Sequence, residues 1–275
     1  MSKGPLDPAR GKEHTLELGD QKLVFKVGDP VNQANAAVFC QMGDTVCLAT
    51  CVMGAKPSEL DYMPLQVVYQ EKYYAGGKIA GSRFRKREGR PADDFILMGR
   101  VIDRGLRPMF PDEFRHDVQV MCTVLSYDFE NEHDILSANA ANLAVALSEC
   151  PVDGPLGSVR VGLIGGELVL NPSREARTKS DLDLFVTVSG EKVVMIEASG
   201  NEVSEADMIR AIAFGKKWAQ KIASFFADLQ KEMGAKKIDV EPAYENAEAL
   251  KFLKEWALPQ VNKVIKDRLG KKERA

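Results

Sequence analysis

Short apolar runs separated by Gly or Asp fill the amino-terminal part of the chain. They lie at residues 23–27, 36–41, 45–53 and 65–69 and are rich in Val, Leu and Phe. Runs of this length between turn-forming residues are typical of β-strands. The pattern therefore predicts an antiparallel meander here, and the run at 118–127 predicts a further strand.

Two segments in the middle of the chain indicate helices. After Pro91, a residue suited to a first helical turn, Met98, Val101 and Ile102 recur at positions i, i+3 and i+4. Residues 134–149 are rich in Ala and Leu and carry few charges. A helix of that composition has no face suited to water, so we expect it to be packed on a sheet.

The strand pattern resumes after Pro155 as two successive hairpins. One turns at Gly165–Gly166, a dipeptide suited to a two-residue primed turn, and the other turns at residues 189–191. Ser204 is followed three residues later by an aspartate, which resembles a capping box and predicts the start of a long helix. Gly234 is a natural end for that helix.

The last residues differ in pattern from the rest. A linker is followed by two short amphipathic segments separated by Pro259, and these cannot enclose a core of their own. We therefore predict two domains. Residues 1–234 form an α+β domain with helices packed on a mostly antiparallel sheet, and residues 235–275 form part of an incomplete helical domain.

Composition narrows the class of protein. Hydrophobic residues make up 45% and charged residues 28% of the chain, as in globular proteins. The five cysteines include no CxxC pair, which favours buried free thiols in a reducing compartment. The first residues are polar, and no apolar run reaches the roughly 18 residues that a membrane span requires. We therefore expect a cytoplasmic protein with no membrane partner.

Positive charge is concentrated in one segment. Residues 78–107 hold nine basic and four acidic residues, a balance of +5, which leaves −8 for the rest of a chain with net charge −3. Local positive charge releases counterions from a bound polyanion, and Phe84, Tyr73 and Tyr74 offer rings on which unpaired bases stack. The segment therefore indicates a site for single-stranded nucleic acid.

Two plainer interpretations of this segment stay open. A basic run is often an ordinary solvated loop, although the glycines between residues 76 and 89 allow a closer approach of the backbone to a ligand. Arg100, Arg104 and Arg107 share one helix face. Ion pairs such as one between Asp103 and Arg107 would give them a structural role.

Several motifs together resemble a known family. They are IAGSRFRKREGRP at 79–91, MGRVIDRGLRPMF at 98–110 and DGPLGSVRVGLIGGELVLNPS at 153–173. They are similar to the first ribonuclease PH-type repeat of the polyribonucleotide nucleotidyltransferases, and the likeness covers nearly the whole chain. Members of that family carry two such repeats, a helical domain between them and trailing RNA-binding modules.

The resemblance implies both a fold and an activity. The family forms a homotrimeric ring around an RNA channel and, with magnesium as cofactor and inorganic phosphate as co-substrate, releases nucleoside diphosphates from RNA 3′ ends. This chain would be the amino-terminal part of such an exoribonuclease in mRNA degradation. It would comprise a ribonuclease PH-like domain and the start of the helical linker domain, guiding single-stranded RNA and assembling the ring.

The resemblance also implies that this chain lacks the catalytic and metal-binding residues of the family. In the family the phosphate pocket and the metal-binding carboxylates lie in the second repeat. Here His133 and Asp134 stand where the active repeat has a serine cluster, and Arg177 with Asp183 stands where it has two aspartates. An arginine at a metal position repels Mg²⁺, so we expect no catalytic residue and no metal site in this chain.

The family's RNA-contacting loop carries over to this sequence. That loop commonly reads GSFFRREGRP, whereas this chain has GSRFRKREGRP, which is one residue longer and gains a charge at Arg83 in place of a ring. The candidate RNA-binding residues are Arg83, Arg85, Lys86, Arg87 and Arg90.

Two alternatives remain at this stage. A stand-alone ribonuclease PH that trims tRNA 3′ ends would need an intact phosphate pocket, and Arg177 and His133 argue against one. A noncatalytic RNA-binding subunit of an exosome-like ring would share the same degenerate residues. The sequence that follows Ala275 in the gene separates the second alternative from the leading interpretation.

Overall fold

The computed structural model describes residues 11–27, 31–79, 90–240, 247–268 and 270. It divides into two units, Met1–Val240 and Glu241–Ala275, each of which is described by itself.

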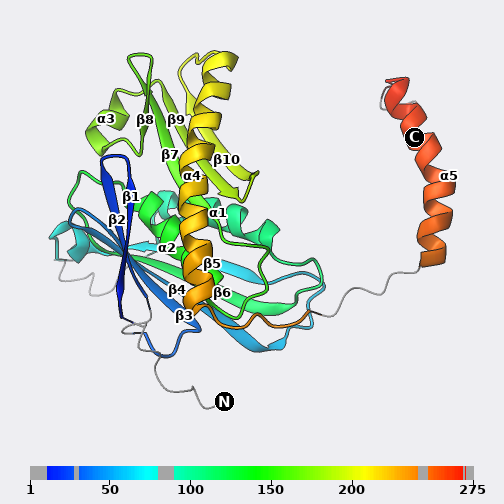
Figure 1. Cartoon of the computed structure of the whole chain (residues 1–275), viewed down its shortest axis with the longest axis horizontal. Coiled ribbons are helices and arrows are strands. Elements are labelled where there is room, and N and C mark those ends of the chain that lie inside the picture. Colours follow the sequence, from blue (N-terminus) through cyan, green and yellow to red (C-terminus); the bar gives the residue numbers. More distant parts are fainter. Residues whose placement is uncertain (1–10, 28–30, 80–89, 241–246, 269, 271–275) are drawn as a thin grey trace. The chain divides into compact units, whose positions relative to one another are not determined.

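Six strands form the larger sheet of the first unit, in the order β1-β2-β3-β4-β6-β5 (Figure 1). Strands β1 to β4 form an antiparallel meander, in which β2 to β4 match the apolar runs and β1 was not predicted, and β6 adds antiparallel to β4. The strands are β1 (Glu13–Leu18), β2 (Gln21–Val27), β3 (Ala36–Met42), β4 (Thr45–Pro57), β5 (Leu65–Glu71) and β6 (His116–Ser126).

The placement of β5 corrects the predicted meander. This strand pairs in parallel with β6 at the sheet edge and does not continue the antiparallel series. Helix α1 (Asp93–Leu106) connects the two strands, and parallel neighbours need a crossover of this kind. The helix packs closely on the strand it follows, since a Cβ atom on Gly99 would lie 3.1 Å from the Val67 carbonyl oxygen.

The second sheet is antiparallel, in the order β10-β9-β7-β8. Both predicted hairpins are confirmed, and Gly165 and Gly166 have φ angles of 57° and 84°, as a primed turn requires. The short helix α3 (Arg174–Thr178) lies between the hairpins in sequence. The strands are β7 (Gly157–Ile164), β8 (Glu167–Leu170), β9 (Leu182–Ser189) and β10 (Lys192–Gly200).

Helix α2 (His133–Leu147) lies between the two sheets (Figure 1). Every residue from Ile135 to Leu147 is buried, which confirms the predicted core helix. Its Asn139 side chain donates to the Ser158 carbonyl at 2.8 Å and accepts the Ser158 amide at 3.0 Å. The Ser158 hydroxyl in turn bonds Thr187 at 2.9 Å. These bonds satisfy the Asn139 side chain and both backbone groups of Ser158, and they join the helix to β7 and, through Ser158, to β9.

The long helix α4 (Glu205–Met233) covers the second sheet and α2. The Ser204 hydroxyl accepts the Asp207 amide at 3.1 Å, which confirms the predicted cap, and Gly234 follows the last turn. The helix crosses β7 at Gly157, where an added Cβ atom would lie 2.1 Å from the Ala219 carbonyl oxygen. Only glycine allows α4 to approach this closely.

Helix α5 (Ala247–Lys266) belongs to the second unit and corrects a further prediction. The sequence predicts two segments broken at Pro259, but one helix runs through that residue. A proline removes a single backbone hydrogen bond, and the good helix formers on both sides keep the helix continuous.

Two features expected from composition, the state of the cysteines and the absence of a membrane span, can be compared with the described residues. All five cysteines are free and buried, as the absence of a CxxC pair predicts. None of the helices in the described ranges is both long enough and apolar enough to cross a membrane.

The end of the first domain lies beyond the predicted residue 234, because residues 235–240 belong to the first unit. Amides of Ala235 and Ile238 donate to the carbonyls of Leu147 and Glu149. The Lys237 ammonium donates to carbonyls at the end of α2, at 2.7 Å to both Ala146 and Ser148. A cation at the carboxyl-terminal end of α2 also interacts favourably with the negative end of the helix dipole.

These contacts generate a prediction about truncation. A chain ending at residue 240 should unfold in urea with the same midpoint as the Met1–Val240 unit of the full chain. A chain ending at 234 should lose about 2–4 kcal/mol, since it lacks two backbone bonds and the bonds of a charged donor. Equal midpoints for the two truncations would show that residues 235–240 add nothing to the first unit.

Candidate functional site

Two adjoining hollows of about 580 and 640 Å³ open at the amino-terminal end of α2. Both are lined by Glu71 of β5, Phe95 of α1, His133 of α2 and Arg174 of α3. We call the first the basic hollow and the second the acidic hollow, after their charged residues. The acidic hollow is also lined by Asp94, Glu132, Asp134, Arg177 and Asp183.

Two arginines form ion pairs with carboxylates of the acidic hollow. Arg160 of β7 is buried and pairs with both Asp134 and Asp183. Arg177 of α3 donates to Asp183 at 2.7 and 2.9 Å and approaches Glu132 at 3.3 Å. Each of these three carboxylates therefore contacts a guanidinium.

The electrostatics follow from this pairing. Burial alone would raise the pKa of Asp183, but Arg160 and Arg177 lower it below its usual range. Burial would lower the pKa of Arg177, and the carboxylates of Asp134 and Asp183 raise it instead. The charged forms are stabilised on both sides, so the cluster is a set of internal ion pairs.

The residues present do not fit a magnesium ion. Mg²⁺ needs carboxylate oxygens whose charge is not already neutralised, whereas here two guanidiniums hold Asp134 and Asp183. The described ranges contain no group of three or more His, Cys, Asp or Glu residues arranged to hold a metal. Metal-assisted chemistry has no support from these side chains.

His133 stands on the wall that the two hollows share. Its Nδ1 atom lies 2.6 Å from the Tyr69 hydroxyl, which donates to Glu71 at 3.1 Å. Burial and the charge of Glu71 raise the pKa of Tyr69 far above its usual value. The centroids of the Tyr127 and His133 rings lie 4.6 Å apart, with their planes at 72°. The imidazole is thus fixed in orientation and belongs to the wall.

The basic hollow has a different lining. In the described part of the chain, four cationic side chains and one carboxylate line it, together with the rings of Tyr73, Phe95, Tyr127 and Phe129. Arg174 donates to the Tyr127 hydroxyl at 3.1 Å, and its guanidinium lies 6.0 Å from that ring. The charged residues are Lys72, Lys78, Arg90 and Arg174 against Glu71.

A tight turn presents Phe129 at this hollow. The Asp128 carboxylate accepts the amides of Glu130 and Asn131 at 2.8 Å and the Asn131 side chain at 2.6 Å. Although burial opposes it, these bonds lower the pKa of Asp128 well below its usual range. Phe129 itself has a φ of 64° and is 54% exposed.

The predicted RNA-binding residues divide between described and undescribed parts of the chain. Arg83, Arg85, Lys86 and Arg87 lie outside the described residues. Arg90 is described, is exposed and lines the basic hollow.

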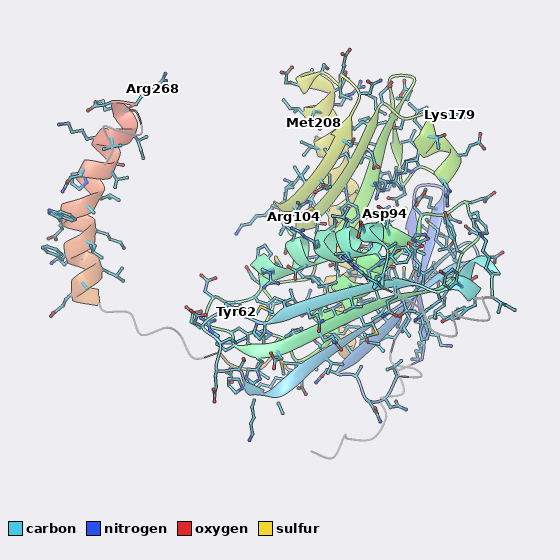
Figure 2. All side chains as sticks on the ribbon, turned by 180° about the vertical axis from the view of Figure 1, so that it is seen from behind. Tyr62, Asp94, Arg104, Lys179, Met208 and Arg268 are labelled. Atoms are coloured by element: carbon cyan, nitrogen blue, oxygen red, sulfur yellow. The ribbon has the colours of Figure 1, made fainter. Side chains whose placement is uncertain are left out.

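A structural role was considered for Arg100, Arg104 and Arg107, and ion pairs confirm it for two of them. Arg107 pairs with Asp103 at 2.6 Å and also donates to the carbonyls of Met63 and Leu65. Figure 2 shows Arg104 on α1 beside the second sheet, where it pairs with Glu197 of β10.

Sequence reasoning missed Arg174, Tyr127 and Phe129 as lining residues. No motif contains them, and they come from two segments distant from residues 78–107. Their only sequence signal is a pair of rings at the end of the predicted strand and an arginine after a hairpin.

The ion-pair cluster generates a prediction about stability. Asp183→Asn should lower the free energy of unfolding by about 2–3 kcal/mol, because it leaves two guanidiniums short of a partner. The pKa of Asp183 is lowered in the folded state, so its contribution is complete above the unfolded value of about 4 and is lost as the pH falls through the folded value. Urea midpoints measured from pH 3 to 7 test both statements.

Asp181→Asn is the matched control, since Asp181 is exposed and lies two residues earlier. It should change stability by less than about 0.5 kcal/mol. An Asp183→Asn variant as stable as the control at pH 7 would contradict a stabilising cluster.

Comparison with known proteins places the chain in a family. Residues 20–151 match domain 1 of the 3′ exoribonuclease family, and residues 154–217 match domain 2. The polyribonucleotide nucleotidyltransferase of Halothermothrix orenii is 46% identical over 228 residues, 83% of this chain and 32% of that protein. That of Thermus thermophilus is 41% identical over 240 residues, 87% of this chain and 34% of that protein. This chain spans about a third of the length of these relatives.

Solved structures agree on the fold. Rice Rrp46 superposes with a TM-score of 0.61 at 16% identity, covering 75% of this chain and 94% of that one. The Archaeoglobus fulgidus exosome with RNA bound to the active site also gives 0.61, at 20% identity, covering 75% and 88%. The ribonuclease PH-like α+β fold is therefore confirmed, and with most of the sequence between residues 20 and 217 matched by its two domains, the chain belongs to the 3′ exoribonuclease family.

Proposed function

We propose that this chain is the amino-terminal part of a phosphorolytic 3′ to 5′ exoribonuclease, a polyribonucleotide nucleotidyltransferase. In this proposal the present repeat guides single-stranded RNA and helps to assemble the ring, while the catalytic centre lies elsewhere in the full-length protein. The names of the relatives support the activity.

One observation carries the proposed division of labour. Arg160 and Arg177 hold the carboxylates of the acidic hollow, while the adjoining basic hollow keeps four cations and several rings. A site that has lost its metal-binding charge and retains positive charge beside it suits contact with RNA better than cleavage of RNA.

The remaining parts of the proposal concern the full-length protein. Inorganic phosphate is its co-substrate, Mg²⁺ is its cofactor, and RNA loses nucleoside diphosphates from its 3′ end. The assembly is a homotrimer in the cytoplasm. In such a ring the residues Arg83, Arg85, Lys86, Arg87 and Arg90 contact the RNA backbone.

A second candidate is a noncatalytic RNA-binding subunit of an exosome-like ring. The neutralised carboxylates favour it equally, and the two similar solved structures share the fold. The leading proposal is preferred because relatives named polyribonucleotide nucleotidyltransferase match at 38–46% identity. A stand-alone ribonuclease PH is disfavoured, since it needs the carboxylates that Arg160 and Arg177 hold.

Binding of RNA tests the proposed guidance. The chain should bind single-stranded oligonucleotides weakly, with little sequence preference and with strong dependence on salt. Replacing Lys86, Arg87 and Arg90 together with Ala removes up to three phosphate contacts. The slope of log K against log salt should become shallower by roughly 0.7 per contact, about 2 units in total. Fluorescence anisotropy across a salt series measures the slope.

Thermal unfolding provides the control for this triple variant. Exposed loop charges add little to stability, so the midpoint should stay nearly constant. A folded triple variant with unchanged affinity and slope would remove the loop from the proposed interface.

Activity tests the proposed absence of catalysis. The chain alone should release no nucleoside diphosphate from poly(A) in the presence of phosphate and Mg²⁺, because Asp134 and Asp183 are already paired with arginines. Chromatography of the nucleotide products measures this release. Product formed by rigorously purified chain, in proportion to its concentration, would place a working centre in this repeat.

A further inference from the structure

The basic hollow has the size and charge of a small-ligand site. Its volume of about 580 Å³ lies within the range of roughly 300–1,000 Å³ typical of such sites. Among the described lining residues, four are cationic and one, Glu71, carries a carboxylate. The adjoining acidic hollow, by contrast, is lined by five carboxylates and two arginines. An anionic group is therefore drawn to one side of the shared wall and repelled from the other.

Rings stand beside these cations. The centroids of Tyr127 and Phe129 lie 4.7 Å apart, and Tyr73 lines the same hollow. Phe129 is 54% and Tyr73 is 53% exposed, so packing in the hydrophobic core does not account for the position of either ring. A large apolar side chain held exposed at positive φ is uncommon, and such strain gathers at binding sites.

The turn that presents Phe129 is firmly held. Asp128 fixes it through bonds to residues 130 and 131, and also accepts the Asp44 amide at 3.1 Å. The Phe129 ring is thus available to a ligand without a large ordering cost on binding.

Arg174, Lys78 and Arg90 are equally available. Arg174 is oriented by the Tyr127 hydroxyl, and this bond raises the pKa of its guanidinium. Within the described ranges Lys78 and Arg90 make no ion pair, and Lys78 is exposed like Arg90. An anionic ligand would therefore bind without first displacing an internal carboxylate from either group.

We propose that the basic hollow binds one nucleotide, with its base against the Phe129 ring and its phosphate against Arg174 and Arg90. The proposal rests on the proposed RNA-guiding function and deepens it. It assigns a nucleotide subsite whose lining residues lie outside the loop at 83–87. Ring and cation together select a nucleotide over a bare anion, because only the nucleotide uses both. The nucleotide is either free or a unit of RNA.

Calorimetric titration of the full chain tests the subsite. Adenosine 5′-monophosphate should bind with a Kd of about 0.1–1 mM at low salt, and inorganic phosphate should bind at least tenfold more weakly. Phe129→Leu should weaken the nucleotide about tenfold without changing the binding of phosphate, because leucine keeps apolar bulk and the same strained φ but removes the ring. Arg174→Ala should weaken both ligands.

Matched variants control for nonspecific effects. Tyr62→Leu removes an exposed ring outside the hollow, and Lys179→Ala removes an exposed cation at the end of α3. Neither should alter the affinity for the nucleotide. Circular dichroism melting should show that all four variants remain folded, which is expected for exposed side chains.

A single-stranded oligonucleotide separates the two possible sources and the two proposals. Competition between the oligonucleotide and the mononucleotide, lost in Phe129→Leu, would assign the subsite to RNA, whereas simultaneous binding of both would assign it to free nucleotides. Binding of the oligonucleotide with no binding of the mononucleotide would overturn the subsite and leave RNA guidance standing. Equal affinity for phosphate and mononucleotide, or a Phe129→Leu variant with unchanged nucleotide affinity, would also overturn it. Binding of the mononucleotide with no binding of the oligonucleotide would remove RNA guidance and keep the subsite.

Discussion

The burial of α2 between two sheets is the constraint on which the rest of the structure depends. A helix with no exposed face takes its polar side chains out of water, and Asn139 is satisfied by bonding both backbone groups of Ser158 on β7. This bond fixes the helix relative to the second sheet. The first turn of α2 is therefore held against Arg160 and Asp183, which come from that sheet.

That fixed first turn divides one cleft into two electrostatic environments. Glu132 and Asp134 face the arginines on one side of His133, and the cations of the basic hollow lie on the other. Charges that pair internally contribute to the fold, whereas Lys78 and Arg90, which make no ion pair within the described ranges, can attract a ligand. The same few residues at the start of α2 thus separate the structural role from the binding role.

Local signals in the sequence were sufficient for much of this fold. Turn glycines predicted the hairpin at Gly165–Gly166, the apolar runs predicted strands β2 to β4 of the meander, and an Ala- and Leu-rich segment with few charges predicted the buried α2. The parallel pairing of β5 was not predicted, because it depends on where the α1 crossover returns the chain. Arg90 was predicted from a basic motif, but Phe129 and Arg174 were not. Their proximity comes from the packing of three separate segments, which no spacing along the chain encodes.

The shared guanidinium of Arg160 has a consequence for the evolutionary history of this repeat. Asp134 and Asp183 are bound by the same side chain, so changing Arg177 to an acid leaves both of them still neutralised. Changing Arg160 alone leaves two carboxylates close together with one fewer cation between them. Each single step towards a metal site therefore gives either a less stable protein or one whose carboxylates are still neutralised. A cluster held by paired arginines is therefore difficult to convert into a metal site one substitution at a time.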